Sequence, residues 1–434
     1  MKTPMMPRRH ALVQLLATAA LAATTAAVPG PAAASGADSG ARHQARAADA
    51  VLFWNRIAAD AFAPTQGTNA LAQSRSFAIL QASVHDALNA IQRRYAAYTP
   101  GVPAAPHASI DAAVATAARE VLVQLLPEQA AMVEAAYADT LQAVRDGRAK
   151  TAGIATGQAA AWVNLNRRLD DGADGATQPV YVPGTGPGEY QFTPPFDFAG
   201  LPGWGRVRPF VIDPAAHALP GPHDLASKAY AQDFAHVKAI GHVHSTTRTA
   251  EQTEIAGFWY EDSPLGWNRI ALAAIQLRRL DAWEAARALA LLHFAMADGF
   301  IAGFAEKYAH RFWRPVTAIH AAADDGNPLT APDVAWQPLL PTPPVPDYPS
   351  THTVLGWAAA EVLIALFGDH LRYDTTSLTL PGVVRSFRGF SQAAEENGAS
   401  RVYAGIHFRH AVHDGRRQGR GIGQAVATAL PPVR

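Results

Sequence analysis

The chain has 434 residues, of which 49% are hydrophobic and 17% are charged, so it is long enough to bury one large core or two smaller ones. Its formal net charge is zero, which argues against nucleic acid or an anionic membrane surface as the main partner. The absence of cysteine excludes disulfides, thiolate catalysis and cysteine-ligated zinc.

The first 34 residues have the pattern of an export signal. Arg8 and Arg9 precede a short apolar run, and small residues at 32–34 resemble a cleavage site. The paired arginines favour twin-arginine export, so we expect a periplasmic or extracellular protein. The apolar run is too short to span a membrane, and we expect no membrane span later in the chain. Residues 35–48 are small and polar and predict a flexible leader.

Helical patterns dominate the remainder of the chain, and no convincing alternating strand pattern interrupts them. The first helix opens at Val51, and an N-terminal helical region is expected over 49–284. Apolar periodicity and alanine-rich composition predict its further helices at 74–95, 110–125, 128–146, 152–169, 225–240, 250–260 and 267–308, the last with at least one break. The sequence therefore predicts an all-α fold of packed helical bundles.

Glycine and proline recur through 170–222, which indicates a long connection or surface excursion. Loops of this length in a compact domain usually carry a function or are disordered. Five aromatic residues suggest that this one packs on the body of the protein, as a roof over a cleft: Tyr181, Tyr190, Phe192, Phe196 and Trp204.

Two histidine groups resemble metal ligands but are weak candidates. His242 and His244 lack a nearby third ligand. His407, His410 and His413 would spread over about a third of a helix circumference and have no fixed carboxylate partner. Neither group is predicted to hold a metal by itself.

Three later segments carry more specific chemistry, and the first contains Lys307 and Arg314. The two cations are seven residues apart and would share a face of a continuous helix, which suits an anion. Pro315 disfavours helical geometry at Arg314, so the helix should end about there. The alternative for this segment alone is a solvated basic face.

The second segment is the run Pro349, Ser350, Thr351 and His352, between a proline-rich approach and an apolar stretch at 354–367 that predicts a buried helix. The first amides of a helix lack internal partners and lie at the positive end of its dipole, which favours an oxyanion. The alternative is that a hydroxyl side chain merely caps the helix.

The third segment contains Arg401 and His407. Six residues separate them, which would place them on different sides of a continuous helix. Gly405 can break the helix, so that Arg401 ends one segment and His407 begins the next. Both side chains would then point at one centre.

In this order the three segments resemble the phosphatidic acid phosphatase type 2 superfamily, which contains vanadium-dependent haloperoxidases and acid phosphatases. Its pattern is K-x6-R-P, then P-S-G-H, then S-R-x5-H, and the match covers about the last third of the chain. Shorter segments at 54–55, 85–90, 248–252 and 336–339 look like the bacterial haloperoxidase-type branch. The resemblance implies the all-α helical bundles of that family, with a catalytic helical domain over 285–434.

The resemblance also implies roles for the residues of the three motifs. The oxyanion, vanadate or phosphate, would be bound by Lys307, Arg314, Ser350, Thr351 through its amide, and Arg401. His407 would supply the axial nitrogen to vanadium, and His352 would be the acid–base on the opposite side.

Three functions remain open on this basis. A haloperoxidase would use a vanadate cofactor, hydrogen peroxide, a halide and a small organic substrate. An acid phosphatase would hydrolyse phosphomonoesters through a phosphohistidine at His407. A non-catalytic protein would only bind an oxyanion. The sequence leaves an oligomer open and does not give the halide or the organic substrate.

The chain departs from the family pattern at three positions. Thr351 replaces the usual glycine, so a β-branched side chain narrows the pocket. Val345 stands where haloperoxidases often carry an aromatic residue or histidine near the halide, which weakens the case for halide oxidation, and for chloride above all. Ala411 replaces the aspartate that orients the nucleophilic histidine in many phosphatases, with Asp414 and Asp298 as candidate substitutes.

Overall fold

The computed structural model describes residues 39–67 and 69–433, so the predicted export signal lies outside the described part of the chain. Residues from Ala41 onwards form a single compact unit. Helix α1 spans Ser39–Phe62. Residues 39–48, expected to belong to a flexible leader, are therefore helical, because this stretch is rich in alanine, a strong helix former, and runs directly into the apolar start of the predicted first helix.

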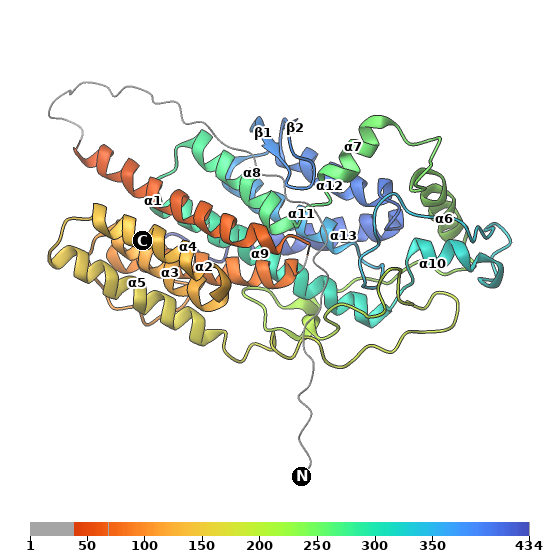
Figure 1. Ribbon diagram of the computed structural model, residues 1–434, viewed down its shortest axis with the longest axis horizontal. Helices are drawn as coiled ribbons and strands as arrows, with labels where there is room; N and C mark the ends of the chain where they lie inside the picture. The colour runs from red at the N-terminus through yellow and green to blue at the C-terminus, as the bar shows by residue number, and fades with distance from the viewer. Residues whose placement is uncertain (1–38, 68, 434) are drawn as a thin grey trace, which may run out of the picture. The chain divides into compact units, whose positions relative to one another are not determined.

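An N-terminal bundle is formed by α2 (Ala70–Ile91), α3 (Ile110–Leu125), α4 (Ala130–Ala143) and α5 (Arg148–Arg167). Helix α3 packs against α2, α4 and α5, and these helices lie side by side in Figure 1. The approach of α5 to α3 depends on glycine, since a Cβ atom at Gly157 would come within 2.5 Å of the Ala113 carbonyl.

Helix α9 (Ala282–His310) connects this bundle to the second half of the molecule. It follows α8 (Ser263–Arg278), and the predicted break between them is made by Arg279 in the left-handed region. Helix α9 packs against α2, α11 and α13. It is long and apolar enough to cross a membrane, but 94% of its apolar window is buried inside the fold, as expected for a core helix.

The second half contains α6 (Lys228–Ile240), α7 (Ala250–Phe258), α10 (Pro315–His320), α11 (Thr351–Phe367), α12 (Phe390–Tyr403) and α13 (Arg409–Val426). Helix α11 packs against α9, α12 and α13 and is buried along most of its length. The end of α9 and this half together supply the three motif segments.

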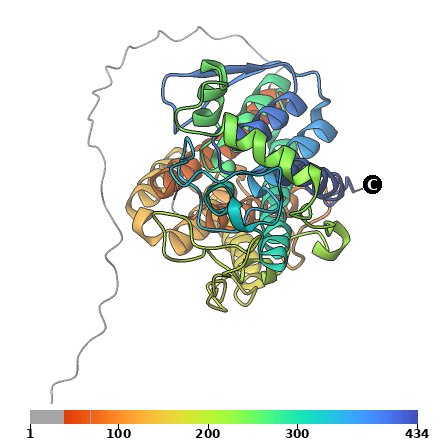
Figure 2. The ribbon, with the colours of Figure 1, turned by 90° about the vertical axis from the view of Figure 1, so that its right-hand side faces the viewer.

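Two short strands, β1 (Tyr373–Thr376) and β2 (Val384–Phe387), form an antiparallel hairpin with Tyr373 opposite Phe387. The hairpin lies at the upper edge of the molecule in Figures 1 and 2. With four residues each, the strands are too short to give a clear alternating pattern in the sequence. The predicted all-α fold is confirmed, with this hairpin as a small addition.

The excursion at 170–222 contains no α-helix, but it carries two 3₁₀ turns, η3 (Trp204–Arg206) and η4 (Pro214–His217). Further 3₁₀ turns are η1 (Ala63–Thr65), η2 (Pro127–Gln129) and η5 (Ala322–Asp324). The excursion is bonded to two motif segments: the Tyr190 amide donates to the Arg311 carbonyl (2.7 Å), and the Gly200 amide donates to the Pro344 carbonyl (2.6 Å). It therefore covers the backbone that leads into the candidate site.

Candidate oxyanion site

Lys307 lies in the last turn of α9 and is fully buried. Its ammonium group donates to the carbonyls of Pro346 (2.6 Å) and Asp347 (3.0 Å). The apolar helix thus delivers one cation to the segment that precedes Ser350.

Arg314 reaches the same place by a different route from the one predicted. Helix α9 ends at His310, because Arg311 adopts a left-handed conformation (φ 48°) that turns the chain. Arg314 is then the extended N-cap of α10, with Pro315 at the first helical position. The prediction that Lys307 and Arg314 share one helix face is wrong, but the turn still directs both cations to the 345–347 backbone.

The guanidinium of Arg314 connects two of the motif segments. Its Nε donates to the Val345 carbonyl (2.7 Å) and its NH1 donates to the Ile406 carbonyl (2.6 Å). NH1 also lies 2.9 Å from His407 Nε2. The side chain is almost fully buried, so these contacts are shielded from water.

Ser350 is the N-cap of α11, but its side chain makes no capping hydrogen bond. Its Oγ instead accepts a hydrogen bond from Thr353 Oγ1 (2.9 Å), which leaves the Ser350 hydroxyl hydrogen free to donate elsewhere. The Ser350 amide donates to the Ala411 carbonyl of α13 (2.9 Å). The structure therefore does not support the simple capping alternative for this serine.

The Thr351 side chain packs against α9, where a glycine makes room for it. A Cβ atom at Gly303 would lie 2.5 Å from Thr351 Cγ2. The Thr351 methyl group therefore fills space beside α9 that is open because residue 303 is glycine. Gly303 thus allows a threonine at position 351, where the family usually has glycine.

His352 is held by the backbone at the end of α7. Its Nε2 lies 2.7 Å from the Trp259 carbonyl, which can only accept, so Nε2 carries the hydrogen and Nδ1 is left with a free lone pair. Arg401 NH1 donates to the same carbonyl (3.4 Å). The guanidinium of Arg401 also lies over the Tyr260 ring at 5.5 Å.

Gly405 separates Arg401 from His407 as predicted. Helix α12 ends at Tyr403, Gly405 has φ 78°, and α13 begins at Arg409. Arg401 is thus at the end of one helix and His407 is just before the next. Arg401 Nε is buried and has no hydrogen-bond partner among the described residues.

The seven residues Lys307, Arg314, Ser350, Thr351, His352, Arg401 and His407 are called the cage below. Burial lowers the pKa of Lys307 and of His407 well below their usual values, and the charge of Arg314 lowers both further. Burial also lowers the pKa of Arg401 to about 10. Burial and the Arg401 charge lower the pKa of His352 well below its usual value, so its imidazole is neutral near pH 7.

Asp347 is the carboxylate that the sequence analysis missed. It is fully buried, its Oδ1 lies 2.8 Å from His407 Nδ1, and it lies 3.9 Å from Arg314 NH1. Burial raises its pKa to about 7, against the opposing charges of Arg314 and Lys307. Asp347 thus opposes the charges of Arg314 and Lys307, while no ion pair is recorded for Arg401 within the described residues, so an added anion would balance the remaining charge.

The two aspartates suggested as substitutes for the missing phosphatase aspartate serve other purposes. Asp298 accepts hydrogen bonds from the amides of residues 210–212 (2.6–3.0 Å) and fixes the excursion to α9. Asp414 accepts a hydrogen bond from Tyr348 Oη (2.5 Å). Neither has a recorded contact with His407 among the described residues, so the structure supports neither of them as a substitute for that aspartate.

Val345 contributes to the site through its backbone. Its carbonyl binds Arg314, while its side chain packs towards Gly200 of the excursion. The structure therefore places an aliphatic side chain at the position where the family often has an aromatic residue or histidine.

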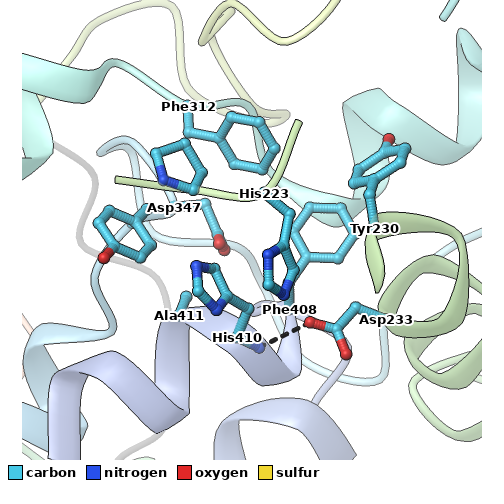
Figure 3. Close-up of a pocket in the computed structure, with 10 residues that line it drawn as sticks. His223, Tyr230, Asp233, Phe312, Asp347, Phe408, His410 and Ala411 are labelled. Carbon is cyan, nitrogen blue, oxygen red and sulfur yellow. Dashed lines mark hydrogen bonds between the residues drawn. The ribbon is translucent and has the colours of Figure 1, made fainter. Parts of the chain in front are cut away.

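A small pocket lies behind the cage, and we call it the rear pocket (Figure 3). Its lining includes His223, Tyr230, Asp233, Asp347, His410 and Ala411. The His223 and His410 rings are stacked with centroids 3.7 Å apart, and the His410 amide donates to Asp233 (2.8 Å). Asp347 thus lines the rear pocket and also contacts His407 of the cage.

The described residues contain no group of three or more His, Asp or Glu side chains arranged to hold a metal ion. His242 and His244 lie 5.7 Å apart, measured between ring centroids, and remain a pair. Of His407, His410 and His413, His407 enters the cage, whereas His410 lines the rear pocket. The donor set of the cage instead fits a tetrahedral oxyanion, because it offers cations, a hydroxyl, helix-start amides and the Nε2 atom of one histidine.

Comparisons with known proteins show a likeness in sequence and in fold. Residues 287–431 match a family model described as the VCPO second helical-bundle domain. Vanadium chloroperoxidase of Curvularia inaequalis is 25% identical over 288 residues, which are 50% of this chain and 46% of that protein. The chain therefore spans about half the length of this curated relative.

Solved structures extend the likeness over most of the chain. The first bacterial vanadium-dependent iodoperoxidase superposes with a TM-score of 0.76 at 26% identity, covering 89% of this chain and 97% of that one. The holo form of a bacterial vanadium-dependent chloroperoxidase superposes with a TM-score of 0.70 at 17% identity, covering 83% of this chain and 92% of that one. The second likeness concerns the fold alone.

Proposed function

Because this chain is a relative of the vanadium haloperoxidases in sequence and in fold, we propose that it is a vanadate-dependent haloperoxidase that oxidises a halide with hydrogen peroxide. One observation carries the proposal. His407 is buried beside three cationic side chains, Lys307, Arg314 and Arg401, and Asp347 is recorded as the opposing charge for the first two only. Such a cluster attracts an anion and offers it one nitrogen ligand.

In the proposed enzyme the three cations neutralise the oxygens of vanadate, with Ser350 Oγ and the Thr351 amide as further donors. His407 Nε2 would be the nitrogen ligand of the anion, and Arg314 NH1, which lies 2.9 Å from this atom, would be a hydrogen-bond donor to the anion. Bound vanadate would supply a Lewis-acidic centre that activates hydrogen peroxide for attack by halide.

His352 is suited to accept a proton in this reaction. The Trp259 carbonyl fixes its Nε2–H, so Nδ1 is the basic atom. The Arg401 charge and burial lower its pKa and keep it neutral before substrate enters. A proton leaving hydrogen peroxide would pass to Nδ1, and an anionic guest would raise the pKa of the ring enough to hold it.

We propose iodide as the preferred halide. One similar solved structure is described as an iodoperoxidase, at 26% identity. Position 345 is where haloperoxidases often carry an aromatic ring or imidazole near the halide. Val345 supplies neither group, and its side chain packs towards Gly200. Iodide is the most easily oxidised of the three common halides and needs the least help from such a group.

The test is a halide-oxidation assay on protein reconstituted with orthovanadate. Iodide, bromide and chloride are each supplied with hydrogen peroxide, and the H407A variant is the control. We expect triiodide to form with the wild-type protein, to depend on vanadate and to be lost in H407A. Absence of oxidation of all three halides by protein that binds vanadate would refute the proposal.

An acid phosphatase is the second candidate, and the His407–Asp347 contact favours it, since a carboxylate beside a histidine suits a nucleophilic imidazole. His407 Nε2 would attack phosphorus while the ester oxygen leaves with a proton from His352. The neutral state of His352 in the free protein disfavours this second role. Phosphate release from a phosphomonoester without vanadate, and its inhibition by vanadate, would support this candidate over the first.

A non-catalytic oxyanion-binding protein is the third candidate, and it requires His352 to be idle. A loss of activity in H352A with orthovanadate binding retained would exclude it. We also propose export, on the basis of residues 1–34. N-terminal sequencing of the periplasmic or secreted protein tests this, and an uncleaved protein confined to the cytoplasm would contradict it.

A further inference from the structure

Asp347 is held rigidly by its own backbone. Its amide donates to the Phe312 carbonyl (2.9 Å), and its carbonyl accepts from the Lys307 ammonium (3.0 Å). The side chain is fully buried, and Oδ1 lies 2.8 Å from His407 Nδ1. A carboxylate fixed in this way restricts the orientation of the imidazole beside it.

The contacts of His407 define which ring nitrogen carries the hydrogen. A guanidinium has donors only, so the contact of 2.9 Å with Arg314 NH1 requires His407 Nε2 to be the acceptor. The neutral ring then carries its hydrogen on Nδ1, on the side of Asp347. Neither His407 Nδ1 nor the Asp347 carboxylate has a hydrogen-bond partner among the described residues, so their approach of 2.8 Å is an ion-pair contact defined by distance, and the two groups are each other's nearest recorded polar neighbour.

The rear pocket offers a second position from which a carboxylate could reach the same nitrogen. Ala411 lies in the first turn of α13, four residues after His407, and lines the rear pocket together with Asp347 (Figure 3). The Ala411 carbonyl binds the Ser350 amide (2.9 Å), so its backbone is fixed relative to the cage. A longer side chain at 411 would extend into the rear pocket.

We propose that Asp347 is a positioning residue that holds His407 in the Nδ1–H form, with Nε2 directed at the oxyanion, and that a carboxylate at position 411 can replace it. This inference rests on the proposed function, because it concerns His407 as the ligand of the oxyanion. The probe is orthovanadate, and its binding is measured apart from any turnover.

The variants are D347N, which keeps the shape of the side chain, D347A, and the double variant D347A/A411D. Removing a carboxylate that orients a ligating histidine weakens binding by about 10–100-fold. We expect this loss of orthovanadate affinity in D347N and D347A by isothermal titration calorimetry, and its recovery to within about tenfold of wild type in the double variant. D233N is the matched control, because Asp233 lines the rear pocket without a contact to His407.

A spectroscopic readout separates positioning from general damage to the fold. In ¹⁵N-histidine NMR spectra of the free protein, the His407 signal, assigned from its loss in H407Q, should show Nδ1–H in the wild type and in D233N. In D347N and D347A the Arg314 contact still favours Nδ1–H, so we expect only a partial gain of the Nε2–H form relative to the wild type, and D347A/A411D should lose this gain. Thermal unfolding of each variant identifies those that are misfolded.

Unchanged orthovanadate affinity and an unchanged His407 form in D347N would overturn the proposal. Failure of A411D to restore either measurement in folded protein would overturn the second half of it. Wild-type protein that binds orthovanadate with His407 in the Nδ1–H form but oxidises no halide would refute the proposed function and leave the role of Asp347 intact.

Discussion

Replacing Gly303 by alanine should destabilise the protein, because the new methyl group would meet Thr351. An ideal Cβ atom at position 303 lies 2.5 Å from Thr351 Cγ2, well inside van der Waals contact. Both residues are buried, so the clash requires α9 or the start of α11 to shift. Overpacking of this kind costs about 1–3 kcal/mol.

The sign of the effect should depend on the residue at position 351. Alanine is about 1 kcal/mol better than glycine inside a helix, so the net cost of G303A in the wild type is roughly 0–2 kcal/mol. In a T351G background both threonine atoms near Gly303 are gone, and the nearest remaining contact is Gln418 Oε1 at 3.9 Å. There G303A should stabilise the protein by up to about 1 kcal/mol.

The assay is a double-mutant cycle on Gly303 and Thr351, with free energies of unfolding from urea titration. Gly299 lies one turn earlier on α9 and is the control, since a Cβ atom there would be 3.5 Å from Leu355 and Val354, an ordinary contact. G299A should have the same effect in both backgrounds. Orthovanadate affinity, measured in parallel, should fall in G303A if the shift reaches the Thr351 amide.

A coupling energy near zero would refute this reasoning. In that case G303A would have the same sign and size in both backgrounds, and the threonine methyl would be free to move to another rotamer. Thr351 would then be merely tolerated in place of glycine, with no compensation by Gly303.

Three further outcomes follow from the contacts. Burial lowers the pKa of His293 from 6.5 to about 3. Between pH 3 and pH 6.5 the unfolded chain therefore binds a proton at this residue that the folded chain does not. The free energy of unfolding should rise with pH in this range by up to about 1.4 kcal/mol per pH unit. H293Q should remove this part of the slope in urea titrations from pH 4.5 to 7.5, and an unchanged slope would contradict it. R401K keeps the charge but loses Nε and should weaken orthovanadate binding by about tenfold, whereas a change below twofold would argue against a direct contact. The Trp259 indole donates a hydrogen bond to Glu396 (2.9 Å), and the backbone carbonyl of Trp259 binds His352. E396Q weakens the first contact and should therefore lower kcat several-fold with little change in KM. A change in KM alone would count against a link between Glu396 and His352.

The cage could be predicted from the sequence because its residues occur in three ordered motifs, each beside a helix end. The break at Gly405 was also predictable, since glycine readily adopts the positive φ that separates α12 from α13. The path of the chain between Lys307 and Arg314 could not be predicted. Arg311 adopts a left-handed conformation, which ends α9 at His310, ahead of Pro315.

Asp347 illustrates what spacing cannot show. It is an isolated aspartate in a proline-rich segment, and its contact with His407 depends on the tertiary structure because the two residues are far apart in the sequence. The sequence directed attention to position 411 and to nearby acidic residues instead. Asp298 was a natural candidate by its place on α9, but its three backbone partners come from residues 210–212, a contact that no periodicity encodes.

The carbonyl contacts of Lys307 and Arg314 also bear on the order in which the protein is assembled. Four backbone carbonyls, those of Val345, Pro346, Asp347 and Ile406, already hold these two cations in position. For the proposed enzyme these contacts predict that the protein can fold before it takes up an oxyanion. Loading would then be a separate exchange step, in which phosphate, which uses the same donors, would compete with vanadate for the folded protein.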